Sequence, residues 1–195
     1  MRTYIPETAV LVPEHAKKVF AGIIFDIYQW EQEQLDGSFK TFEMIKRPDT
    51  VNIIPIHDGK IILGKETQPH TGTFLDVPAG MHDKNEEDEL AAAKRELLEE
   101  TGYTFKNWKL IEACQAGSGK IEQIVYTFIA SELDEIVEQN LDKGGEQIDI
   151  VHMTLDEVKM LRNDPIMRYY EHSIFAYADT VDDLINLPSV YNYGN

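Results

Sequence analysis

The sequence predicts an α+β fold, and three observations lead to this class. Short stretches rich in β-branched and aromatic residues recur along the chain, and the pairs Asp36-Gly37 and Asp58-Gly59 mark tight turns between them. One longer segment, residues 88–101, instead carries apolar residues at helical spacing. Strands and helices follow one another without regular strand–helix–strand alternation, which favours a mixed α+β architecture over a doubly wound parallel sheet.

The first half of the chain predicts a hairpin arm followed by strands of a main sheet. A long hairpin is expected from Gly22 to Lys46. It ends before Pro48, because proline lacks an amide hydrogen and restrains its neighbour. The chain is therefore divided into an N-terminal arm, residues 1–46, and a main domain, residues 47–195. The strands expected next are 51–57, 60–64 and 73–77, the last followed by Pro78-Ala79-Gly80.

A helix is expected from about Asp88 to Thr101. It stops at Gly102, because glycine readily adopts the left-handed conformation that often follows a last helical turn. Its buried stripe is expected at three- and four-residue steps, on Leu90, Ala93, Leu97 and Thr101.

The second half predicts further strands and two helices. The expected strands are 109–114, 123–130 and 148–153. The acidic stretch 131–142, which ends at Gly144-Gly145, is interpreted as a loop. Thr154 to Glu157 forms a capping box that opens a second helix, and a third helix is placed between residues 171 and 187.

Composition limits the classes of partner. The 195 residues include 18 basic and 35 acidic side chains, a net charge of -17, which argues against nucleic-acid polymers and anionic membranes as partners. The single cysteine, Cys114, rules out an internal disulfide and fits a reducing compartment, so a cytoplasmic location is expected. No stretch approaches the roughly 18 to 20 apolar residues of a membrane span.

The predicted helix carries a cluster of acidic residues near its end. Glu96 and Glu100 stand four apart and share a face, with Glu99 close beside them. Like charges at this spacing repel one another, and the negative end of the helix dipole adds to the cost. Mg²⁺ or Mn²⁺ would offset it, since both prefer carboxylate, carbonyl and water oxygens. A solvated acidic face is the alternative, and composition alone does not separate the two.

Residues 78–103 resemble the Nudix box, the signature of hydrolases that split a nucleoside diphosphate linked to another group. That motif reads Gly, five residues, Glu, seven residues, Arg-Glu-apolar, one residue, Glu-Glu, one residue, Gly-apolar. The string RELLEETGY at 95–103 matches its second half, and Glu87 lies eight residues before Arg95. Gly80 lies seven before Glu87 where the motif has six, so one residue is inserted in the loop 81–86. The resemblance implies the Nudix fold, a mixed β-sheet sandwiched between helices, here with an N-terminal β-hairpin arm.

Features outside the box are similar to the ADP-ribose pyrophosphatase branch of this family. They are the hairpin arm, a strand like 50–56 and the Pro-Ala-Gly turn. In that branch the N-terminal sheet serves dimerisation and helps bind the nucleobase, so a homodimer is implied. The apolar surface of the hairpin also predicts a homodimer, because an isolated hairpin is marginally stable. Members of the branch often have a proline where this chain has residues 115–118, and an arginine where it has residues 66–70. This chain has neither. Both positions concern substrate selection.

The resemblance implies an activity and a set of site residues. The activity is metal-dependent hydrolysis of the diphosphate linkage of a nucleoside diphosphate sugar such as ADP-ribose, with Mg²⁺ or alternatively Mn²⁺. The implied metal ligands are the carbonyl of Ala79 and the carboxylates of Glu96, Glu99 and Glu100. Arg95 is expected to orient a glutamate of this cluster and to contact Glu87. The general base of the branch lies on a late loop and corresponds here to Glu146, with Glu99 as the alternative.

Two other functions stay open at this point. The same fold could hydrolyse dinucleoside polyphosphates or nucleoside triphosphates, or it could be a non-catalytic domain that binds nucleotide sugars. Nudix domains that bind a ligand without turnover usually lack some of these glutamates or carry an added DNA-binding domain. Because Glu96, Glu99 and Glu100 are all present and the acidic chain has no separate basic module, catalysis on a small nucleotide is favoured.

Overall fold

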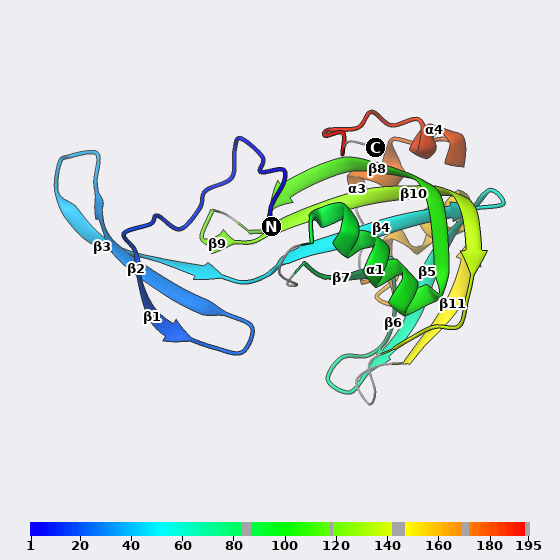
Figure 1. Cartoon of the computed structure of the whole chain (residues 1–195), viewed down its shortest axis with the longest axis horizontal. Helices are drawn as coiled ribbons and strands as arrows, with labels where there is room; N and C mark the ends of the chain where they lie inside the picture. The colour runs from blue at the N-terminus through cyan, green and yellow to red at the C-terminus, as the bar shows by residue number, and fades with distance from the viewer. Residues whose placement is uncertain (83–86, 118, 142–146, 169–171, 194–195) are drawn as a thin grey trace.

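A computed structural model describes residues 1–82, 87–117, 119–141, 147–168 and 172–193. Its N-terminal part is a four-stranded sheet in the order β1-β2-β3-β9. The strands are β1 (Lys17–Ala21), β2 (Asp26–Glu33), β3 (Phe39–Lys46) and β9 (Ile121–Glu122). Figure 1 shows the β2–β3 hairpin extending away from the body. The parallel pairing of β3 with β9 connects this sheet to the body, because β9 lies between the long strands β8 (Tyr103–Gln115) and β10 (Ile124–Ile136).

The body contains a seven-stranded mixed sheet. Its main order is β11-β5-β4-β10-β8, with β6 paired to β5 and β7 to β4. Only the β4–β10 pair is parallel among the pairings of this sheet in the described chain. The strands are β4 (Asp49–His57), β5 (Lys60–Gln68), β6 (Gly72–Asp76), β7 (Ala79–His82), β8 (Tyr103–Gln115), β10 (Ile124–Ile136) and β11 (Gln147–Met153).

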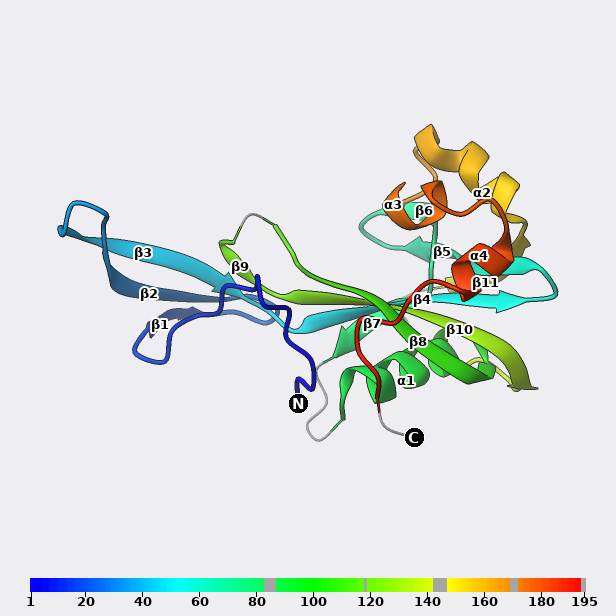
Figure 2. The ribbon, with the colours of Figure 1, turned by 90° about the horizontal axis from the view of Figure 1, so that it is seen from above.

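Helices cover both faces of this sheet (Figure 2). The long helix α1 (Glu89–Thr101) lies on one face. The other face is covered by α2 (Leu155–Met160), the 3₁₀ turn η1 (Leu161–Asn163), α3 (His172–Ala176) and α4 (Val181–Ile185). Successive residues of β4 alternate between the two cores, Ile53 with α1 and Ile54 with α2 to α4. The mixed sheet sandwiched between helices is the predicted architecture.

Local signals in the sequence placed several elements correctly. Gly37 has a left-handed backbone in the turn of the β2–β3 hairpin. The Asp88 side chain caps α1 by accepting from the Ala91 amide, and Gly102 ends the helix with φ 76°. Within the predicted stripe, Leu90 is only partly buried, while Ala92, which was not predicted, is fully buried.

Two expectations for the second half were wrong. Residues 131–136 are not loop but the end of β10, where Leu133 pairs with Phe105 of β8. The acidic side chains made this segment resemble a loop in the sequence. The backbone hydrogen bonds between strands form whether or not the outward side chains are charged. The predicted third helix is two short helices, because Thr180 starts a new capping box with Asp183.

The first residues of the chain lie along the body. The guanidinium of Arg2 binds both carboxylate oxygens of Asp49, at 2.6 and 2.9 Å, and Glu122 at 3.0 Å. Both acids are almost fully buried, so this ion-pair network anchors the N-terminus where the arm meets the body.

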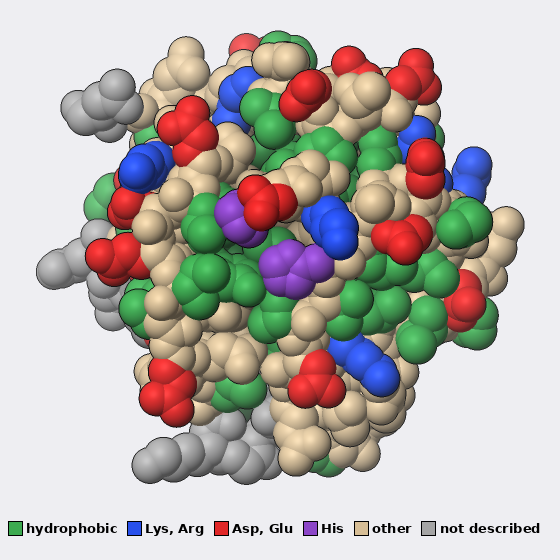
Figure 3. All heavy atoms as spheres, turned by 90° about the vertical axis from the view of Figure 1, so that its right-hand side faces the viewer, with side chains coloured by type: hydrophobic (Ala, Val, Ile, Leu, Met, Phe, Trp, Pro, Cys, Tyr) green, Lys and Arg blue, Asp and Glu red, His purple; other side chains and the backbone are tan. Residues whose placement is uncertain are grey.

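At the end far from the arm, acidic side chains are more frequent than basic ones on the surface (Figure 3). Acidic and basic side chains are interspersed there with apolar ones, as Figure 3 shows. No helix in the described segments is long and apolar enough to cross a membrane.

Candidate active site

The C-terminal half of α1 faces the short strand β7. Pairing of β7 with β4 sets Gly80 opposite Val51 and Ala79 opposite Asn52. The Ala79 amide donates to Oε2 of Glu100 at 3.1 Å. The Glu96 carboxyl lies so close to the Cα of Gly80 that a Cβ built there would overlap it. Glu96 and Glu100, one turn apart on the helix, therefore meet two consecutive residues of one strand.

Arg95 connects this pair to the rest of the acidic cluster. Its Nη2 and Nε donate to the two oxygens of Glu87 at 2.9 and 3.2 Å. Its Nη1 donates to Glu96 at 2.5 Å and to Glu99 at 3.2 Å, and Nη2 also reaches the Met81 carbonyl at 3.0 Å. Burial lowers the pKa of Arg95, but the hydrogen bonds to Glu87 and Glu96 outweigh it and hold the pKa above its ordinary value. The guanidinium thus fixes three carboxylates at once.

The segment after β10 satisfies carbonyls at the end of α1. Amides of Val137 and Asn140 donate to the carbonyls of Gly102 and Glu99, at 2.8 and 3.0 Å. The Gln139 side chain donates to the Glu100 carbonyl at 2.5 Å and to the Ile148 carbonyl at 3.2 Å. Orphan carbonyls of the last turn are therefore paired, and β11 is held beside it. The expected base, Glu146, lies outside the described residues.

One acidic residue near this site was not singled out from the sequence. Asp76 ends β6, three residues before Ala79, and accepts from the Val77 amide at 2.8 Å. Burial and the nearby charge of Glu66 raise its pKa to about 7, against smaller opposing effects of the Val77 amide and of Arg168. The sequence shows an ordinary aspartate before Pro-Ala-Gly, and its burial depends on contacts made by the folded sheet.

The site has the chemistry of a divalent-cation site. In the described chain no three His, Cys, Asp or Glu side chains are arranged closely enough to bind an ion as they stand. The donors themselves fit: carboxylates of Glu96, Glu99 and Glu100 beside the backbone of residues 79–80 are the hard oxygens that Mg²⁺ and Mn²⁺ prefer. The missing side chain of Gly80 leaves the space that the Glu96 carboxyl fills. This arrangement supports the metal ligands inferred from the motif.

The fold and this glutamate-lined strand–helix junction define a hydrolase of diphosphate compounds. The chain belongs to the Nudix family, since the NUDIX domain model matches residues 46–172. The ADP-ribose pyrophosphatase of Bacillus subtilis (strain 168) is 34% identical over 147 residues, which cover 74% of this chain and 79% of that protein.

Two further proteins are similar to this chain. The methanol dehydrogenase activator of Bacillus methanolicus is 27% identical over 143 residues, covering 72% of this chain and 77% of that protein. The crystal structure of an ADP compounds hydrolase superposes with a TM-score of 0.66 at 22% identity, covering 80% and 84% of the two chains. The structural likeness confirms the predicted Nudix fold, and the family membership confirms the predicted enzyme class, a Nudix hydrolase.

Proposed function

We propose that this Nudix hydrolase splits the diphosphate linkage of a nucleoside diphosphate sugar, with ADP-ribose as the first substrate to test. The products are a nucleoside monophosphate and a sugar phosphate. The observation that carries the proposal is the intact junction at which Glu96 meets Gly80 and Glu100 meets Ala79. The identity with the Bacillus subtilis ADP-ribose pyrophosphatase, which extends well beyond the box, supports the choice of substrate.

We infer that Mg²⁺, or Mn²⁺, is held by Glu96, Glu99, Glu100 and the Ala79 carbonyl. When bound, such an ion neutralises the diphosphate and lowers the pKa of the attacking water. The chain's own residues prepare the site. Gly80 leaves room for the Glu96 carboxyl, the Ala79 amide orients Glu100, and Arg95 sets the orientation of Glu96 and Glu99. Arg95 is in this account a positioning residue.

We propose Glu146 as the general base that takes the proton of the water, with Glu99 as the alternative. Support comes from the described residues that are closest to Glu146 in the sequence. Gln139 joins the Glu100 carbonyl to the Ile148 carbonyl, so the start of β11 is tied to the last turn of α1. Ile148 is two residues beyond Glu146 in the sequence, and this proximity in the chain supports the choice of Glu146.

A substrate screen tests the proposal. The purified protein with Mg²⁺ is given ADP-ribose, other nucleoside diphosphate sugars, a dinucleoside polyphosphate and a nucleoside triphosphate, and phosphate is measured after phosphatase treatment. We expect the diphosphate sugars to react fastest and EDTA to abolish the reaction. Faster turnover of the polyphosphates or triphosphates would reassign the substrate. Binding of ADP-ribose without turnover of any compound would indicate a non-catalytic domain.

We also propose that residues 1–46 form a dimerisation arm of a cytoplasmic homodimer. Several large apolar side chains of this region are exposed in the single chain, and a second copy of the chain would bury them. They are Val19, Phe20, Ile23, Ile24, Phe25, Leu35 and Phe39. Such a surface is typical of an interface between chains. Light scattering at micromolar concentration checks this, and an active monomer would contradict it.

A further inference from the structure

A cavity of about 630 Å³ lies between α1, β8 and the C-terminal segment 189–193. Its volume is within the range of ordinary small-molecule sites. Aromatic and basic side chains dominate its wall, and none of its described lining residues is acidic. The lining includes Leu90, Lys94, Lys106, Trp108, Tyr191 and Tyr193.

This cavity is separate from the active site. Lys94 and Glu96 are two positions apart on α1, which places them roughly 200° apart around the helix axis. Leu90 and Lys94, which line the cavity, are four apart and share one face. Glu96 and Glu100 lie on a different face, against β7. A ligand in the cavity would therefore not touch the glutamate cluster.

The C-terminal wall is held in place by hydrogen bonds. The Val190 amide donates to the Leu110 carbonyl of β8 at 2.9 Å. The Tyr193 hydroxyl donates to Oε2 of Glu89 at 3.0 Å. Glu89 is fully buried in the first turn of α1 and also accepts from the Thr3 amide at 2.6 Å. The wall is thus formed before any ligand arrives, which reduces the entropy lost on binding.

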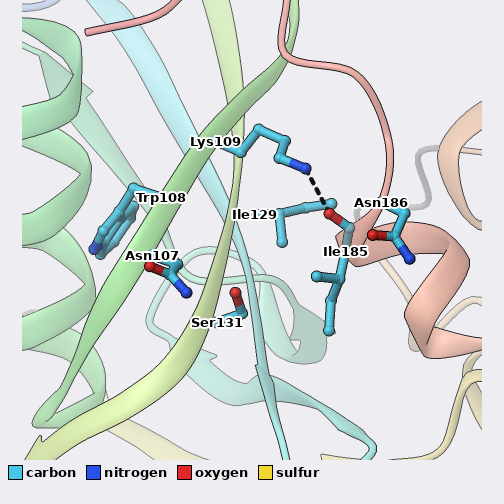
Figure 4. A pocket seen from close by; sticks show the side chains of 7 residues that line it. All are labelled: Asn107, Trp108, Lys109, Ile129, Ser131, Ile185 and Asn186. Atoms are coloured by element: carbon cyan, nitrogen blue, oxygen red, sulfur yellow. Dashed lines mark hydrogen bonds between the residues drawn. The ribbon is translucent and has the colours of Figure 1, made fainter. Parts of the chain in front are cut away.

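Two ammonium groups supply positive charge. The Lys94 ammonium lies 6.0 Å from the Trp108 ring centroid, and in the described chain it has no carboxylate partner. Lys106 faces Asp134 at 3.5 Å in an exposed pair, which binds weakly and can exchange for a ligand. Lys109 also lines the cavity, but its ammonium is not available to a ligand there. Figure 4 shows the ammonium on the other side of β8 from Trp108, where it donates to the Ile185 carbonyl at 2.6 Å. On a chain of net charge -17, a wall with lysines and no acidic lining residue among those described favours an anion locally.

The rest of the wall is aromatic. Trp108 packs edge-on against Phe128, with ring centroids 6.3 Å apart, and Phe128 is 5.8 Å from Tyr193. Tyr193 in turn contacts Tyr191 at 5.0 Å. Trp108, Tyr191 and Tyr193 are each only partly buried, so their rings keep surface for a further flat group. Aromatic surface beside cationic groups suits a nucleobase that carries a phosphate.

We propose that this cavity is a second, non-catalytic nucleotide site for a nucleoside monophosphate. The base packs against Trp108 and Tyr193, and the phosphate binds Lys94 and Lys106. An inorganic anion would use the lysines alone and gain nothing from the rings.

The two tryptophans of the chain, Trp30 and Trp108, allow a direct test. Protein labelled with 5-fluorotryptophan gives two ¹⁹F resonances, which Trp30→Phe assigns. AMP added in EDTA is expected to move the Trp108 resonance in a saturable way. Lys94→Gln combined with Lys106→Gln should weaken this binding at least about tenfold, which is about 1.4 kcal/mol. The pair Lys40→Gln and Lys120→Gln removes the same charge outside the cavity and should leave the dissociation constant unchanged.

Three results would overturn the proposal. One is a Trp108 resonance that does not move at millimolar AMP, and another is equal binding by the Lys94/Lys106 variant. The third is a shift with inorganic phosphate as tight and as large as that with AMP, which would mean a simple anion site. The proposal does not depend on the catalytic one. The Trp108 shift should persist in Glu100→Gln, whether or not the parent hydrolyses ADP-ribose.

Discussion

The carboxyl group of Glu96 occupies the space beside Gly80 where the side chain of any other residue would begin. Strand β7 and helix α1, between which the sequence has one residue more than the motif, are therefore in contact at the point where the motif places a metal ion. The φ angle of Gly80 is not in the left-handed region, so the requirement for glycine here is steric rather than conformational.

Gly80→Ala is expected to displace the Glu96 carboxyl and to lower turnover roughly 10- to 100-fold, the usual effect of disturbing a ligand's surroundings. The Mg²⁺ concentration for half-maximal rate should rise, as a titration at fixed substrate would show. Met81→Ala is the control, because this neighbouring side chain is exposed. An unchanged Mg²⁺ requirement in Gly80→Ala would remove Glu96 from the metal site.

Arg95→Lys keeps the charge but loses the fork that binds Glu87 through two nitrogens. We expect a loss of roughly 10- to 100-fold in kcat or metal affinity. Glu87→Gln should have a similar but smaller effect. The double variant should lose less transition-state stabilisation than the sum of the losses in the two single variants, because both changes act through one contact. Strict additivity in steady-state kinetics would show that Arg95 works independently of Glu87.

Asp76 predicts a pH dependence of stability. Its pKa is about 7 in the folded protein, above the ordinary 3.8, because of burial and Glu66. Between these two values the folded state binds more protons than the unfolded state, so this group's contribution to stability falls as pH rises, until about pH 7. Asp76→Asn removes this effect. The stability of the parent relative to the variant should fall by about 2–3 kcal/mol from about pH 5 to about pH 8.

Urea unfolding in EDTA measures this difference at both pH values. Asp36→Asn serves as the control, because hydrogen bonds from Ser38 lower the pKa of that exposed carboxyl instead. A constant difference between the parent and Asp76→Asn at both pH values would show that Asp76 is ionised throughout.

Glu146→Gln should lower kcat by roughly 10² to 10⁴, the usual contribution of a general base. The Mg²⁺ requirement and KM should change far less, because proton transfer contributes mainly in the transition state. Stopped or coupled assays over a Mg²⁺ series separate these quantities. If Glu146→Gln is as active as the parent across the series, the base has to be sought at Glu99.

Local rules explain what could be predicted from the sequence. Helical spacing placed Glu96 and Glu100 on one face, and the left-handed cap at Gly102 ended the helix where expected. The contact of Arg95 with Glu87 also followed from their positions in the motif. Each of these depends on residues close in the chain or on a recurrent pattern.

Burial by distant residues explains what could not be predicted. Glu89 looks like a solvated acid of the first helical turn, but it accepts hydrogen bonds from Thr3 and Tyr193, which are 86 and 104 residues away. Asp76 likewise becomes partly buried only when β6 joins the sheet. The sequence has no local signal for either event, because the charge of an acidic residue predicts exposure unless its partners are known.

The measurement that most directly tests the account is a Mg²⁺ titration of ADP-ribose hydrolysis by the parent and by Glu100→Gln, with AMP release as the readout. Glutamine keeps the shape of Glu100 and can still accept the Ala79 amide, but it removes the ligand charge. We predict that turnover falls by roughly 10² or more, as for loss of a main electrostatic contribution, while the melting temperature without metal stays close to that of the parent. Glu100→Gln with the parent's rate and the parent's Mg²⁺ requirement would contradict metal-dependent hydrolysis at this junction.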